Sequence, residues 1–68
     1  MINKLESIMA VIDYIENNLN KKLDLSSIAN AVGYSKYHLH RMFTNMVGLS
    51  IHNYVQRRQL TEAAKLLV

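Results

Sequence analysis

The fold of this chain is decided by residues 25–48, LSSIANAVGYSKYHLHRMFTNMVG. Apolar residues recur at helical spacing in two segments of this stretch, and Gly33 separates the segments. Gly33 can adopt the left-handed backbone conformation that ends a helix, and the small side chain of Ala29 lets a second helix cross closely. The pattern is typical of two short helices joined by a tight turn, which is a helix-turn-helix.

Capping chemistry marks the helix boundaries independently. Asp24, Ser35 and Ser50 are candidate N-caps, and each is flanked by apolar residues at the positions that form a hydrophobic staple. The second cap predicts a helix over 36–47, and Gly48 ends it. The buried stripe of this helix is expected to contain Leu39, Met42, Phe43 and Met46.

The opposite face of the 36–47 helix carries polar side chains that suit a DNA base edge. Tyr37, Arg41 and Thr44 share this outer face, with His40 and Lys36 on one flank and Asn45 on the other. Arginine can donate two hydrogen bonds to guanine, tyrosine can pack on a thymine methyl group or reach a phosphate, and a lysine near the helix start suits the DNA backbone. A polar face that only meets solvent is the alternative interpretation.

The same residues resemble the AraC/XylS family of bacterial transcription regulators. The resemblance covers nearly the whole chain, and its motif is Leu25-x-x-Ile28-Ala29-x-x-Val32-Gly33-Tyr34-Ser35-x-x-x-Leu39-x-Arg41-x-Phe43, followed by Gly48, Tyr54 and Arg57-Arg58. It implies a DNA-binding domain in which the second helix of this motif, the one that follows Ser35, enters the major groove.

The resemblance also implies base contacts from Tyr37, His40 and Arg41. Thr44 is expected to join them because it lies on the same outer face, and phosphate contacts are expected from Ser35, Lys36, Asn45, Arg57 and Arg58. Tyrosine replaces the tryptophan that close relatives frequently carry at Tyr37. Family members have about 100 residues with a second helix-turn-helix, so residues 1–68 are expected to form a single subdomain that ends inside the linker helix.

Composition limits the alternatives. The chain has 68 residues, no proline, no cysteine and only two glycines, so we expect one small all-α domain. The helix-turn-helix and the family resemblance imply that this domain is a homeodomain-like bundle of four helices. The net charge of +3 is uneven, because residues 1–35 carry −1 and residues 36–68 carry +4. The positive half suits a polyanion, although ordinary solubilising charge would look the same. No signal peptide or membrane span is visible, so a cytoplasmic location is expected.

Two further helices are predicted on either side of the central stretch. The first, over 3–20, is expected to bury Leu5, Ile8, Met9, Ile12, Ile15 and Leu19. The last, over 50–68, has two apolar faces in series: Ile51, Tyr54 and Val55 on one side, then Leu60, Ala63, Ala64 and Leu67 on the other. The second face predicts a separate packing partner.

Other chemistry is disfavoured. His38 and His40 diverge on a helix and no cysteine or carboxylate stands at ligand spacing, so neither a metal nor another cofactor is expected. No phosphate loop or nucleophile motif is present, so the chain is not expected to be an enzyme.

The candidate partners are double-stranded DNA, RNA polymerase and a second copy bound through the end of the last helix. The alternative function is a small protein-interaction module that docks a partner on the 60–68 apolar face.

Overall fold

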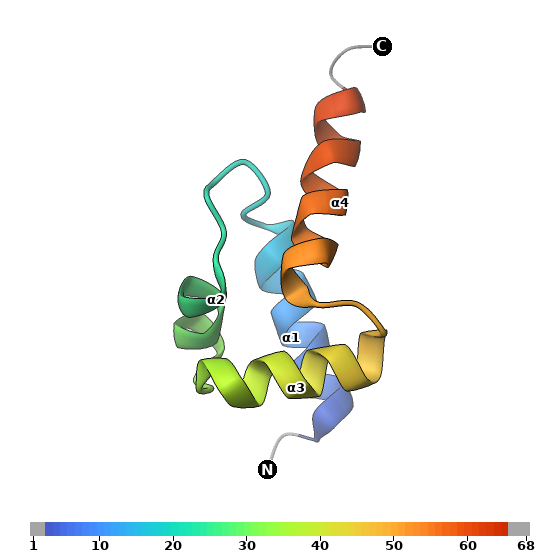
Figure 1. The fold of residues 1–68 in the computed structure, drawn as a ribbon. Helices are drawn as coiled ribbons and strands as arrows, with labels where there is room; N and C mark the ends of the chain where they lie inside the picture. Colours follow the sequence, from blue (N-terminus) through green and yellow to red (C-terminus); the bar gives the residue numbers. More distant parts are fainter. Residues whose placement is uncertain (1–2, 66–68) are drawn as a thin grey trace.

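In the computed structural model, which describes residues 3–65, the chain forms four helices and confirms the all-α prediction. They are α1 (Lys4–Glu16), α2 (Leu25–Val32), α3 (Lys36–Val47) and α4 (Ile51–Lys65). Figure 1 shows α3 lying across the lower part of the molecule, while the axes of α1 and α4 are steeply inclined to the axis of α3. The far end of α4 projects past α1 and α2, which makes the molecule elongated at 42 × 21 × 18 Å.

The helix starts follow from capping side chains. Oxygens of Asp24, Ser35 and Ser50 accept the N–H of the residue three positions on, at 2.8, 3.1 and 3.1 Å, as the sequence predicts. Asn3 caps α1 in the same way, at 2.8 Å from the N–H of Glu6. Each cap satisfies a backbone donor that the first helical turn leaves without a partner.

The helix ends follow from the two glycines. Gly33 closes α2 with φ 79° and Gly48 closes α3 with φ 85°, both in the left-handed region. They are the positive-φ residues of the described part of the chain, and both are glycines. The turn between α2 and α3 therefore has the geometry that the sequence predicts.

One core joins all four helices. It contains ten apolar residues, and Phe43, Ile15, Ile28, Leu39 and Val11 are the largest that are fully buried. Ala29 of α2 is 2% exposed and belongs to this core, which agrees with the predicted need for a small residue on the inner face of α2. The complete set is Ile8, Val11, Ile15, Ile28, Ala29, Leu39, Met42, Phe43, Ile51 and Val55.

The prediction for the first helix was wrong in two respects. The helix ends at Glu16 and not at Asn20, because the side-chain amide of Asn18 bonds the Tyr14 carbonyl oxygen at 2.7 Å and competes with a further turn. Its buried face is Ser7, Ile8, Val11 and Ile15, whereas Leu5 and Met9 are each 60% exposed. The face turned toward α2 and α3 is thus rotated from the expected one. In α3, likewise, Met46 is 42% exposed and lies outside the buried stripe.

The predicted change of face in α4 is present. Ile51 and Val55 are buried and Tyr54 is half-buried, while Leu60 is 73% exposed and Ala63 and Ala64 are also exposed. Leu67, the last member of the second face, lies outside the described residues. Between residues 3 and 65, no helix combines the length and the apolar character needed to cross a membrane.

Candidate nucleic-acid interface

Helix α3 is held firmly on one side and free on the other. Leu39 and Phe43 are fully buried and Met42 is 7% exposed, so the inner face of α3 is part of the core. Tyr54 of α4 meets the Phe43 ring edge-on, with centroids 5.6 Å apart. Because this face is fixed by packing, the opposite face points outward in a defined direction.

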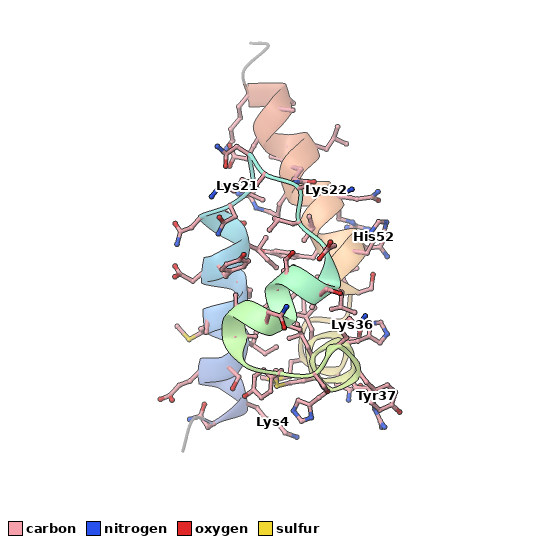
Figure 2. All side chains as sticks on the ribbon, turned by 90° about the vertical axis from the view of Figure 1, so that its left-hand side faces the viewer. Lys4, Lys21, Lys22, Lys36, Tyr37 and His52 are labelled. Atoms are coloured by element: carbon pink, nitrogen blue, oxygen red, sulfur yellow. The ribbon has the colours of Figure 1, made fainter. Side chains whose placement is uncertain are left out.

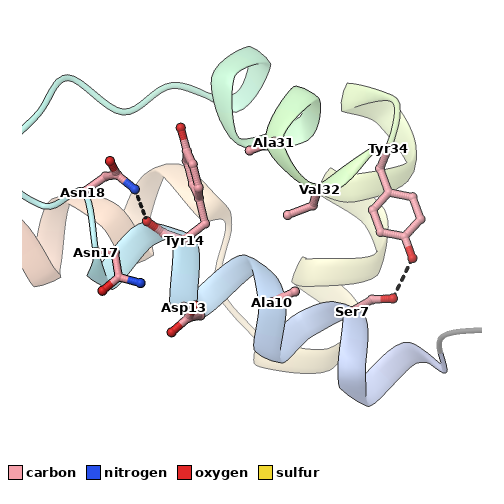
Figure 3. Close-up of a pocket in the computed structure, with 9 residues that line it drawn as sticks. All are labelled: Ser7, Ala10, Asp13, Tyr14, Asn17, Asn18, Ala31, Val32 and Tyr34. Atoms are coloured by element: carbon pink, nitrogen blue, oxygen red, sulfur yellow. Dashed lines mark hydrogen bonds between the residues drawn. The ribbon is translucent and has the colours of Figure 1, made fainter.

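The start of α3 is anchored to α1. The hydroxyl groups of Tyr34 and Ser7 are 2.6 Å apart in a hydrogen bond, and the Tyr34 ring stacks on His38 with centroids 5.0 Å apart and planes 23° apart. Figure 3 shows this bond at one end of a hollow of about 340 Å³ between α1 and α2. None of the predicted DNA-contact residues lines that hollow. Its contribution to the site is the anchoring bond.

Tyr37 and Arg41 form a pair on the outer face. Nη1 of Arg41 donates a hydrogen bond to the Tyr37 hydroxyl oxygen at 3.1 Å, and the guanidinium carbon is 5.6 Å from the centre of the Tyr37 ring. Tyr37 is 70% exposed, so the pair stands clear of the core. A guanidinium held by both a hydrogen bond and a cation–π contact loses less side-chain freedom when it meets a ligand. The other two guanidinium nitrogens of Arg41, Nε and Nη2, have no hydrogen-bond partner within residues 3–65.

The structure leaves several other predicted residues exposed at the start and along the length of α3. Lys36, His40 and Asn45 are exposed side chains of α3. The Ser35 oxygen accepts the His38 N–H as the helix cap, which leaves its hydroxyl hydrogen available as a donor.

Thr44 differs from the sequence prediction of an outward polar group. It is half-buried, and its hydroxyl oxygen is buried without a hydrogen-bond partner in the described part of the chain. Any contact of Thr44 with a base would have to come from its methyl group. An unpaired buried hydroxyl also costs stability.

The structure separates the two adjacent arginines of α4. Arg57 is exposed. Arg58 instead bonds Glu16 of α1 through two nitrogens, Nε at 2.9 Å and Nη2 at 2.6 Å, and its Nη2 also lies 3.0 Å from Glu62. This arrangement lowers the pKa of Glu16, chiefly through the hydrogen bonds from Arg58, and raises the pKa of Arg58. The phosphate contact predicted for Arg58 would require that intramolecular pair to open.

Three basic or ionisable residues outside the predicted set of DNA contacts border α3. Lys4, from the start of α1, lines a hollow of about 270 Å³ together with Tyr37, Arg41 and Asn45. On the other side of α3, Lys22 and His52 line a hollow of about 540 Å³ with His40. Figure 2 shows Lys36 and Tyr37 at the start of α3, with Lys4 below them and Lys22 and His52 above. No spacing in the sequence signals these neighbours, because tertiary packing brings them together.

One acidic group lies among these cations. The Asp24 carboxylate caps α2, and its hydrogen bond from the Ser27 N–H is the main reason that the pKa of Asp24 is lowered, with smaller contributions from Lys22 and Lys36. Its negative charge opposes a phosphate close to the α2 cap. The most favourable region for a polyanion is therefore the outer face and the start of α3.

Comparison with known proteins agrees with this geometry. The family model for "Bacterial regulatory helix-turn-helix proteins, AraC family" matches residues 15–56, which is more than half of the chain and includes all of α2 and α3. The chain is 43% identical over 58 residues to the HTH-type transcriptional activator AarP of Providencia stuartii, which covers 85% of this chain and 43% of AarP.

Two further relatives extend the comparison. Identity is 41% over 61 residues with the multiple antibiotic resistance protein MarA of Escherichia coli, covering 90% of this chain and 48% of MarA. With the transposon Tn10 TetD protein of Escherichia coli it is 39% over 54 residues, covering 79% of this chain and 39% of TetD. The chain thus spans less than half the length of these relatives. No solved structure matches it.

Proposed function

Because the chain belongs to the AraC family of bacterial regulatory helix-turn-helix proteins and is a DNA-binding regulator domain, we propose that it reads a specific duplex sequence with α3 in the major groove. The family is one of transcription regulators and not of enzymes, which confirms the expectation that the chain is not an enzyme. Sequence-specific reading by α3 is the part that goes beyond family membership. A cytoplasmic location follows from this role, since a bacterial regulator acts where the chromosome lies.

The observation that carries the proposal is the outward Tyr37–Arg41 pair on a helix whose other face is fixed in the core. An α-helix fits the width of the major groove, and an arginine there commonly donates to the O6 and N7 atoms of guanine. With Nη1 bonded to Tyr37, the remaining Nη2 and Nε edge of Arg41 is the one proposed to meet guanine. Tyr37 packs beside the neighbouring base and orients the guanidinium.

The other proposed contacts divide by position along α3. His40 lies one residue before Arg41 and is proposed to reach the adjacent base, while Thr44 contributes only its methyl group, which suits a thymine methyl. Ser35, Lys36 and Asn45 are proposed to bind phosphates at the groove edges, together with exposed Arg57. Phosphate contacts of this kind set the register of a helix on DNA but carry no base information.

The test is a titration of labelled duplexes by fluorescence anisotropy, with a preferred site first selected from a random pool. Arg41→Ala should weaken binding to that site by about 1 to 3 kcal/mol and relax preference at one base pair. Lys36→Ala should weaken all sequences about equally and reduce the salt slope by about one. Lys65→Ala removes an equal charge at the far end of α4 and serves as the control. If both α3 variants bound like the parent chain at low salt, α3 would not be the reading helix.

A second function is favoured by one observation, the exposed apolar end of α4. Leu60 is 73% exposed, with Ala63 and Ala64 beside it. We propose as the alternative that this face docks another protein surface, which would be a second copy of the chain or, for a transcription regulator, RNA polymerase. Self-association that is insensitive to salt would support the alternative, whereas a steep loss of duplex binding with added salt supports DNA reading.

A further inference from the structure

The second half of α4 is held in place by polar contacts and not by the apolar core. Ile51 and Val55 are the buried residues of α4, and both lie in its first two turns. Beyond Val55 the described part of the helix buries no apolar side chain. Figure 1 nevertheless shows α4 continuing alongside the C-terminal end of α1 and the loop that follows it. Burial of apolar side chains from α4 thus ends at Val55, so the contacts that its second half makes with the rest of the fold have to be sought among polar groups.

The first polar contact is a two-pronged ion pair. Arg58 meets both carboxylate oxygens of Glu16, at 2.9 and 2.6 Å, and the two side chains are only 27% and 34% exposed. A guanidinium and a carboxylate joined by two parallel hydrogen bonds fix both distance and orientation, which a single lysine contact does not. Glu62 approaches the same nitrogen from one turn further along α4, at 3.0 Å. The pair therefore ties the middle of α4 to the last residue of α1.

The second polar contact lies on the next residue. The side-chain amide nitrogen of Gln59 donates to the main-chain carbonyl oxygens of Leu19 and Lys21, at 3.2 and 3.0 Å. These carbonyls belong to the segment that follows α1, outside any helix, so they need partners from elsewhere. Gln59 thus ties α4 to the loop between α1 and α2, just before the Asp24 cap.

We propose that Arg58 and Gln59 form a polar clamp that sets the direction of α4 relative to the helix-turn-helix, and that Arg58 is a positioning residue and not a phosphate contact. The clamp itself depends only on the fold. Its relevance to DNA reading rests on the proposed function, since it fixes how whatever α4 carries is oriented relative to α3. The clamp explains why adjacent arginines differ, with Arg57 exposed and Arg58 paired across 42 positions of sequence.

The two roles of Arg58 predict opposite effects for Glu16→Gln. If Arg58 bound phosphate, removing the Glu16 charge would free its guanidinium and strengthen duplex binding. If Arg58 is part of the clamp, Glu16→Gln and Arg58→Gln break the same contact, so each loosens α4 and the double variant does little more than either one. The salt slope of duplex binding then stays at the parent value in Arg58→Gln.

The direction of α4 can be measured in the full chain, which contains no natural cysteine to interfere. Spin labels on Ser26→Cys in α2 and Ala64→Cys in α4, both exposed positions, report the distance between the two helices by pulsed electron resonance. We expect one narrow distance distribution in the parent chain and a clearly broader one in Arg58→Gln, Glu16→Gln and Gln59→Ala. Arg58→Lys, which keeps the charge but loses the fork, should fall between them.

Arg57→Gln is the matched control, one residue away on the same helix. It should leave the distance distribution unchanged and lower the salt slope by about 0.9, the reverse of Arg58→Gln. A narrow distribution that persists in both Arg58→Gln and Glu16→Gln would overturn the clamp, as would a lower salt slope in Arg58→Gln together with tighter binding in Glu16→Gln. If Arg58→Gln unfolds, Gln59→Ala decides: broadening supports the clamp and an unchanged distribution refutes it. Absence of duplex binding by the parent chain would defeat the proposed function, while the label distances would still judge the clamp.

Discussion

The two glycines that end α2 and α3 offer a quantitative test of what the turn requires. Gly33 and Gly48 have φ of +79° and +85°, and a Cβ built on either one meets no atom within 4 Å. A substitution at these sites therefore causes no clash, and its whole cost comes from the backbone conformation. For residues other than glycine the left-handed region costs about 1 to 2 kcal/mol, and a less flexible unfolded chain returns about 0.4 to 1 kcal/mol of it.

We therefore expect Gly33→Ala and Gly48→Ala each to lower the free energy of unfolding by about 1 kcal/mol, which is about 4 to 8 °C in melting temperature for a domain of this size. Gly33→Val should cost more, because a β-branched side chain fits the left-handed region worst, and Gly33→Asn should cost only a few tenths of a kcal/mol. The 12 residues of α3 separate the two sites by about 18 Å, so the double alanine variant should lose the sum of the two effects.

Urea denaturation followed by far-ultraviolet circular dichroism gives these free energies directly. The comparison of Gly33→Asn with Gly33→Val is the decisive one, because both add a side chain but only one tolerates the conformation. Equal losses in the two variants would refute the backbone explanation. So would a loss in Gly33→Ala several times that in Gly48→Ala, since the two sites have the same φ and the same open surroundings.

Three further results are expected. Ala29→Leu should lower the free energy of unfolding by about 1 to 3 kcal/mol through overpacking, since Ala29 is 2% exposed, and thermal melting measures the loss. Thr44→Val should raise the melting temperature without weakening duplex binding, because it removes a buried hydroxyl oxygen that has no partner. Folding lowers the pKa of Glu16 and of Asp24, so the stability that these carboxylates contribute is present above their unfolded values of 4.5 and 3.8 and is lost as the pH falls through the folded values. The free energy of unfolding of the parent chain should therefore fall below about pH 4.5. An acid titration of Glu16→Gln should show a weaker dependence of stability on pH in that range.

Features that depend on a few neighbouring residues could be predicted from the sequence. The caps at Asp24, Ser35 and Ser50 and the helix ends at Gly33 and Gly48 are all present, because capping and left-handed backbone are local chemistry. The outward direction of Arg41 followed for the same reason, since the apolar stripe of α3 allows only one face to be buried. The helical period is therefore sufficient to predict which face of α3 points outward.

Periodicity was insufficient where two apolar arcs compete on one helix. In α1, Met9 and Val11 are both apolar, and the sequence favoured the arc with Leu5 and Met9. The structure buries Val11 completely and leaves Met9 60% exposed, because α2 and α3 approach from the Val11 side. Thr44 shows the same limit on α3, where the approach of neighbouring residues covers a hydroxyl that the helical wheel places outward. Which arc is covered depends on the positions of other helices, and no period within one helix encodes that.

The adjacent arginines Arg57 and Arg58 of α4 show most clearly what the sequence cannot predict, because they have the same charge and neighbouring positions and therefore look equivalent. On a helix they point about 100° apart, and that rotation turns Arg58 toward Glu16 on α1 while Arg57 stays exposed. The net charge of +4 on residues 36–68 therefore overstates what is available to a polyanion by one, because Arg58 is paired with Glu16 outside that range. The same count omits Lys4, which packing brings beside Tyr37 and Arg41. The positive electrostatic potential around α3 depends on which Lys and Arg side chains are already paired with carboxylates inside the fold. Charge counting becomes a measure of nucleic-acid affinity only after those internal pairs have been subtracted.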